Sequence, residues 1–119
     1  MTDSMSNIKQ GELMSWVGTT DYTGGIGVTV KFTLKDSEIA NFQALCKNQL
    51  DFVMTLKGHK SFKMHEDFKN PAVFWLVEEW ESMAAWKPYL ASKERAANAE
   101  AMMPMMAGPP FIALYKIKN

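Results

Sequence analysis

The sequence predicts a single α+β domain whose elements follow the order strand, helix, strand, strand, helix, strand. Three observations predict it: an alternating apolar segment from residue 26, two later segments with apolar residues at helical spacing, and an Asn-Pro turn between two strand-like segments. This is the order of the split βαβ, or ferredoxin-like, fold (βαββαβ), with both helices on one face of a four-stranded antiparallel sheet. The 119 residues, 47% of them apolar, suffice for one such core. We divide the chain into an N-terminal arm, partly flexible, over residues 1–24 and the domain over 25–119.

The first strand and the first helix have the clearest patterns. Apolar and polar residues alternate over residues 26–35, which is the two-residue period of a half-buried strand. Asp36 and Ser37 then offer a helix cap, and Gly58 is a typical helix stop. The apolar residues between them recur at helical spacing: Ile39, Phe42, Cys46, Leu50 and Val53.

The second half contains a hairpin, an interrupted helix and a last strand. Strands are expected over residues 61–68, 73–80 and 111–117, and Pro71 favours a turn between the first two. A helical segment follows Ser82 and continues through the alanine-rich residues 93–103. Pro88 lies inside it, and an interior proline costs a helix roughly 3 kcal/mol, so we expect two short helices or a kink near residues 87–92.

Composition and charge exclude several classes of protein. Lys and Arg number 13 and Asp and Glu number 13, so no net field attracts phosphates and nucleic acid is an unlikely partner class. The chain shows neither a signal peptide nor an apolar run long enough to cross a membrane. A single cysteine, Cys46, with ten methionines fits a reducing, cytoplasmic location. The two histidines, His59 and His65, are not at a metal-binding spacing, so we expect no metal.

The third strand predicts that both faces of the sheet are covered. Apolar side chains of residues 73–80 point to both sides, whereas a sheet with one face in water alternates cleanly. Two helices on one face leave the other face exposed, and large exposed apolar patches are rare on monomers. We therefore expect a homodimer in which this face packs on a second copy. The alternative is that the N-terminal arm folds over it.

The end of the third strand and the helix after it carry a family resemblance. With Glu78-Glu79-Trp80-Glu81-Ser82 followed by a helix containing Tyr89-Leu90-Ala91-Ser92, the chain resembles the antibiotic biosynthesis monooxygenase domain family over residues 26–117. The resemblance implies a dimeric α+β barrel with one small pocket per subunit between sheet and helices. It also implies one of several activities: cofactor-free oxygenation of polycyclic quinols, haem degradation, or turnover of small carbonyl compounds. The haem-degrading branch has a histidine farther along this helix that the chain lacks, so haem chemistry is disfavoured.

Three side chains are candidate catalytic residues. Imidazoles as a class change charge near neutrality, so His65 is a candidate base if its strand face turns toward the barrel; the alternative is an ordinary solvent-facing position. Glu78 and Glu79 point to opposite faces, so one of them approaches a covered region, where burial raises a carboxyl pKa; a salt bridge to Lys31 is the competing explanation. Tyr89 is a candidate hydrogen-bond donor to a substrate oxygen.

Aromatic rings and methionines are the candidate substrate-binding wall. Trp75, Trp80 and Trp86 can stack on a flat molecule, although some of these rings should be plain core packing. Met102 and Met105, in the cluster around Pro104, either cover an apolar pocket or simply pack a helix end.

These features lead to a first hypothesis and two alternatives. The first is a cofactor-independent monooxygenase or isomerase that acts on a small apolar aromatic or carbonyl compound, with His65 or a glutamate as base, Tyr89 as donor and no cofactor. The alternatives are a non-catalytic dimeric module that binds a small ligand or a protein, and a structural dimer whose interior is filled by side chains.

Overall fold

The computed structural model describes residues 21–118, so most of the predicted arm lies outside the described residues. The order of elements is the one predicted, with the second helix divided in two. The elements are β1 (Ile26–Thr33), the 3-10 helix η2 (Asp36–Glu38), α2 (Ile39–Val53), β2 (His59–Glu66), β3 (Val73–Trp80), α3 (Met83–Leu90), α4 (Lys93–Met102), the 3-10 helix η3 (Met103–Met105) and β4 (Phe111–Lys116).

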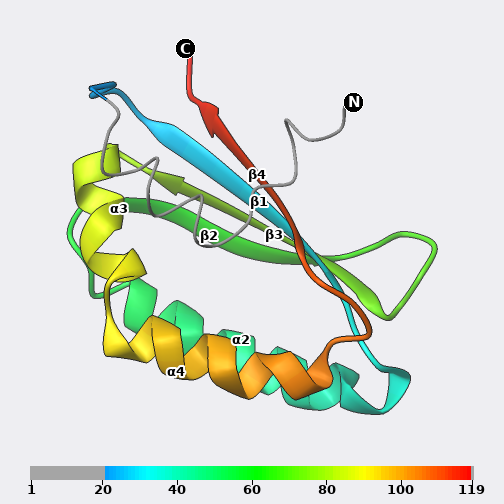
Figure 1. The fold of residues 1–119 in the computed structure, drawn as a ribbon. Coiled ribbons are helices and arrows are strands. Elements are labelled where there is room, and N and C mark those ends of the chain that lie inside the picture. The colour runs from blue at the N-terminus through cyan, green and yellow to red at the C-terminus, as the bar shows by residue number, and fades with distance from the viewer. Residues whose placement is uncertain (1–20, 119) are drawn as a thin grey trace.

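The strands form one four-stranded sheet in the order β2-β3-β1-β4, with every neighbouring pair antiparallel. Helices α2 and α4 lie side by side under one face of this sheet (Figure 1). The fold is therefore the predicted ferredoxin-like α+β fold. Because β2 and β4 are the edge strands, β1 and β3 form the centre of the sheet surface that faces the helices.

The register decides which side chains face the helices. In β3 the even-numbered residues Phe74, Leu76, Glu78 and Trp80 are buried, whereas Trp75, Val77 and Glu79 are only partly covered. Opposite them, β1 places Val28, Val30 and Phe32 on the helix side. Glu78, and not Glu79, is thus the carboxylate on the covered face.

The first helix differs from its prediction at both ends. Asp36 and Ser37 lie in η2 and make no side-chain cap, and α2 ends at Val53, before the expected stop. Gly58 instead lies directly before β2 with a φ of 88°, a conformation that favours glycine. The chain needs this residue to turn from the helix into the sheet.

The second strand begins and ends two residues earlier than predicted. It runs over His59–Glu66, so His59 is a strand residue and not an imidazole in the exposed turn before the strand. The His59 ring lies edge-on to Trp80 at a centroid distance of 5.5 Å, and burial lowers its pKa. Aromatic contact with the buried Trp80 explains why the strand extends to this residue.

The predicted break in the second helix is confirmed. Pro88 lies within α3, and the chain restarts as α4 at Lys93 after two residues. Ser92 caps the new helix, since its hydroxyl accepts a hydrogen bond from the Arg95 backbone N–H at 3.1 Å. This break allows α4 to run beside α2 instead of continuing along α3 (Figure 1).

Candidate functional site

A cavity of about 740 Å³ lies between the sheet and helices α2, α3 and α4. Its floor is apolar and comes from β1, β3 and β4, with Val28, Val30, Leu76 and Ile112 among its residues. The volume is within the range of pockets that bind small organic molecules. An apolar floor of this size suits an apolar ligand.

The roof of the pocket comes largely from α4, which contributes no buried residue to the core. Its residues Ala96, Ala99 and Met102 line the pocket, and Ala96 and Ala99 are too short to reach far into it. The methionines continue the roof: Met103, which is 70% exposed, and Met106 also line it. Flexible thioethers adapt to irregular ligands, so this side of the pocket can adjust its shape.

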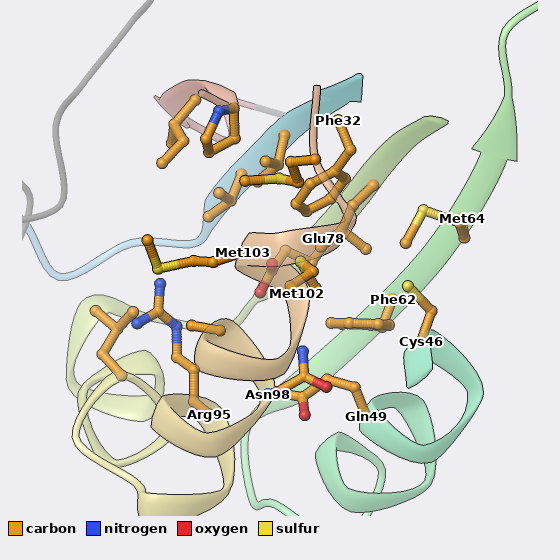
Figure 2. A pocket seen from close by; sticks show the side chains of 18 of the residues that line it. Phe32, Cys46, Gln49, Phe62, Met64, Glu78, Arg95, Asn98, Met102 and Met103 are labelled. Carbon is orange, nitrogen blue, oxygen red and sulfur yellow. The ribbon is translucent and has the colours of Figure 1, made fainter. Parts of the chain in front are cut away.

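The polar lining is sparse and comes from the helices and β3. Figure 2 shows the Glu78 carboxylate pointing from β3 toward the helices, with Arg95 and Asn98 of α4 and Gln49 of α2 on the helix side of the pocket. A few converging polar groups in an apolar cavity are typical of a site that orients a ligand.

Glu78 is the most unusual ionisable group of the site. Its side chain is 3% exposed, and burial raises its pKa from 4.5 to about 7, although a hydrogen bond from Trp80 and the charge of Arg95 both act to lower it. The Trp80 Nε1–H donates to Glu78 Oε1 at 2.7 Å. This carboxyl therefore exchanges a proton near neutral pH, as a general base at pH 7 must. The competing explanation of a salt bridge with Lys31 does not hold for Glu78, because Lys31 lies over the Trp75 ring on the other face of the sheet.

Tyr89 is fixed beside Glu78 by aromatic packing. Its ring stacks on that of Trp80, with centroids 5.4 Å apart and an interplanar angle of 23°. Its hydroxyl accepts a hydrogen bond from Gln49 Nε2 at 2.6 Å, and burial raises the pKa of the phenol, so it stays protonated. Arg95 lies 5.9 Å from the centre of the same ring. Base and hydroxyl are thus held by two stacked rings.

The structure brings only some of the sequence-predicted residues to this pocket. Glu78, Tyr89, Trp86 and Met102 line it. Trp80 is fully buried behind it and holds Glu78 and Tyr89, and Met105 packs against the core beside it.

His65 and Trp75 lie elsewhere. They are cross-strand partners on the opposite face of the sheet, where His65 is exposed and Trp75 donates to Asp67 at 2.9 Å. The alternation of β2 explains the position of His65, because Phe62 and Met64 occupy the pocket side. His65 therefore does not reach the pocket and cannot act as its base.

Sequence reasoning missed Gln49, Arg95 and Asn98. Gln49 lies one helical turn from both Cys46 and Val53, on the face where the pattern predicts apolar residues. A polar residue at that position could have marked Gln49 as a candidate site residue. Arg95 and Asn98 carried no such signal, because α4 has no apolar face that fixes its orientation.

Neither a metal site nor a membrane-spanning helix is found within residues 21–118. Within that part of the chain, His, Cys, Asp and Glu side chains nowhere gather in threes that would suit a metal ion. The helices of that same part are all too short or too polar to cross a membrane.

A match to a protein-family model, which includes residues of this pocket, assigns the chain to a family. The model of the antibiotic biosynthesis monooxygenase family matches residues 25–101, which include Glu78, Tyr89 and Arg95. The chain belongs to this family. The antibiotic biosynthesis monooxygenase match extends from the start of β1 nearly to the end of α4, and so covers most of the pocket.

Solved structures with the same fold support the architecture. A candidate antibiotic biosynthesis monooxygenase from Caulobacter crescentus is 23% identical, with a TM-score of 0.79 over 82% of this chain and 93% of that one. A conserved protein from Methanosarcina mazei is 19% identical, with a TM-score of 0.76 over 81% and 95%. A variant of SnoaB, a cofactor-independent oxygenase from Streptomyces nogalater, is 14% identical, with a TM-score of 0.73 over 81% and 95%. A search of curated proteins found no match.

Proposed function

We propose that this protein is a cofactor-independent monooxygenase that oxidises an apolar aromatic compound with an acidic C–H or O–H group. The observation that carries the proposal is Glu78, a buried carboxyl with a pKa of about 7 that points into an apolar pocket of about 740 Å³. A family whose name describes monooxygenases and a fold shared with a cofactor-independent oxygenase support it.

The reaction needs electrons, and in this scheme the substrate supplies them. Glu78 removes a proton from a ring methylene flanked by aromatic rings, as in an anthrone or a quinol tautomer. The resulting carbanion transfers an electron to O₂, and the two radicals join to form a carbon–oxygen bond. The peroxide takes up the proton from Glu78, and Glu78 then removes the second proton of the same carbon as the O–O bond breaks. The carbon becomes a ketone, and the leaving hydroxide takes up that second proton to give water. One oxygen atom enters the product and the other enters water, and all four electrons come from the methylene carbon, so no external reductant is consumed.

The other lining groups have supporting roles in this proposal. The Tyr89 hydroxyl donates to a substrate oxygen on which negative charge develops, and the Arg95 guanidinium adds a positive field on the same side of the pocket. Trp86 and Met102 form apolar walls that exclude water, which strengthens both effects. His65 has no role in this scheme, because it lies on the other face of the sheet.

Oxygen uptake with anthrones and dihydroxynaphthalenes tests the proposal. Wild type should consume one O₂ for each ketone formed, and Glu78→Gln should lower kcat by at least about 100-fold, which is the usual contribution of a general base. Glu79→Gln is the matched control, because it makes the same chemical change on the opposite sheet face. Wild-type rates equal to the uncatalysed background would reject the oxygenase; ligand binding without uptake would instead favour the non-catalytic binding module.

We also propose that the protein is a homodimer built on the open face of the sheet. This face combines Trp75 and Val77 of β3 with Phe111, Ala113 and Tyr115 of β4, and Tyr115 is 41% exposed. A second copy across a two-fold axis would cover these side chains. Light scattering over a dilution series is expected to give twice the 13.5 kDa mass of one chain; a persistent monomer would rule the dimer out.

A further inference from the structure

Gln49 is a polar side chain where the helix pattern calls for an apolar one. Within residues 21–118 the buried polar or charged side chains are Gln49 and Glu78, and both line the pocket. A buried amide is unfavourable unless its hydrogen bonds are made. The bond that Gln49 makes, at 2.6 Å, goes to the Tyr89 hydroxyl and not to the backbone.

The direction of this hydrogen bond matters for the ligand. The Gln49 amide N–H donates, so the Tyr89 oxygen is the acceptor and the phenolic hydrogen is left for another group. Within the described residues, 21–118, Tyr89 donates no hydrogen bond to the protein. The ring is stacked on Trp80 and packed near Phe52, and these contacts fix the position of the phenolic oxygen. The phenolic hydrogen is therefore free for a ligand in the pocket that Tyr89 lines.

We propose that Gln49 is a positioning residue that keeps Tyr89 a hydrogen-bond donor to the ligand, and that the pocket selects ligands with an accepting oxygen at that point. This proposal rests on the proposed function for its choice of ligand class, aromatic compounds with a carbonyl or phenolate oxygen. The selectivity arises because a ligand without that oxygen leaves a buried O–H unpaired. A site built this way discriminates a quinone from the corresponding hydrocarbon, which apolar walls alone do not do.

Binding of two matched probes tests the proposal without any turnover. The probes are menadione, a methylated naphthoquinone, and methylnaphthalene, which has the same ring skeleton without the carbonyl groups. Dissociation constants are measured by calorimetry for wild type, Tyr89→Phe, Gln49→Leu and Gln49→Glu. The quantity of interest is the ratio of the two constants in each protein, because a merely structural defect weakens both probes together.

Wild type should bind menadione more tightly, and Tyr89→Phe should reduce that preference by roughly 2- to 10-fold, the loss expected for one neutral hydrogen bond. Gln49→Leu should reduce it as well, since the hydroxyl loses the partner that fixes its orientation. Gln49→Glu provides the sharper comparison. Its protonated form, favoured at about pH 6 in this buried place, still donates to Tyr89, whereas its ionised form, at about pH 9, accepts the phenolic hydrogen and removes it from the ligand.

The preference of Gln49→Glu should therefore fall as the pH rises, and that of wild type should fall less. Other groups near Tyr89 also carry or change charge, namely Glu78 of β3, Cys46 of α2 and Arg95 of α4, and the wild-type titration accounts for them. An equal preference in wild type and both Gln49 variants would overturn the proposal, as would a wild type without preference. Oxygen uptake is measured separately, so loss of the oxygenase assignment and loss of this one are distinguishable.

Discussion

Replacement of Glu78 by glutamine should change how stability depends on pH. In the folded protein the pKa of this carboxyl is raised from 4.5 to about 7 by burial, so the folded state holds the proton more tightly than the unfolded state. The contribution of this carboxyl to the free energy of unfolding is therefore greatest below pH 4.5, and it falls as the pH rises toward 7. Glu78→Gln has no charge to bury and keeps an oxygen that can accept from Trp80 Nε1.

The magnitude follows from the two pKa values. They differ by 2.5, and a difference of one corresponds to about 1.4 kcal/mol, so the full effect is about 3 kcal/mol, of which about 2 to 3 kcal/mol falls between pH 5 and pH 8. Urea unfolding of both proteins at these two pH values measures it. The free energy of unfolding of Glu78→Gln, minus that of wild type, should increase by this amount at the higher pH. An unchanged difference, with Glu79→Gln behaving like wild type, would show that the carboxyl is not buried as described.

Three more predictions concern single residues. Gly58→Ala should lower the free energy of unfolding by about 1 to 3 kcal/mol in a urea titration, because φ is 88° there and the new methyl would overlap Ala85; no loss would contradict the turn geometry. Ser82→Ala should cost about 1 kcal/mol in the same assay, since its hydroxyl accepts from the Ala85 N–H at 3.1 Å; a Ser82→Asn variant that retains stability would confirm the cap. Burial raises the pKa of the Cys46 thiol to about 12, so iodoacetamide at about pH 8 should label it only after unfolding, as mass spectrometry would show; rapid labelling of the folded protein would refute its burial.

The fold was predictable because its signals are local. Alternation in β1 and the Asn-Pro turn before β3 follow from the chemistry of neighbouring residues, and β3 is found at the predicted bounds. The interruption near Pro88 followed from a missing backbone donor. Strand ends were less predictable: His59 joins β2 through its contact with Trp80, which is distant in sequence.

The site was only partly predictable because it depends on which strand face meets the helices. The pattern of β3 is apolar on both sides, so the sequence left Glu78 and Glu79 as alternatives, and only packing separates them. The same ambiguity placed His65 among the candidates, although its neighbours Phe62 and Met64 are the pocket residues of β2. Arg95 reaches the site because α4 restarts after Ser92, a change of direction that no local pattern specifies.

The proposed catalysis depends most directly on the protonation of Glu78. Carbon-13 NMR of protein labelled at glutamate carboxyls, with Glu78→Gln to assign the resonance, measures it directly. Burial of the carboxyl should give Glu78 a titration midpoint near 7. A midpoint near the ordinary value of 4.5 would contradict it, because the pocket would then hold a permanently charged carboxylate instead of a base that works at neutral pH.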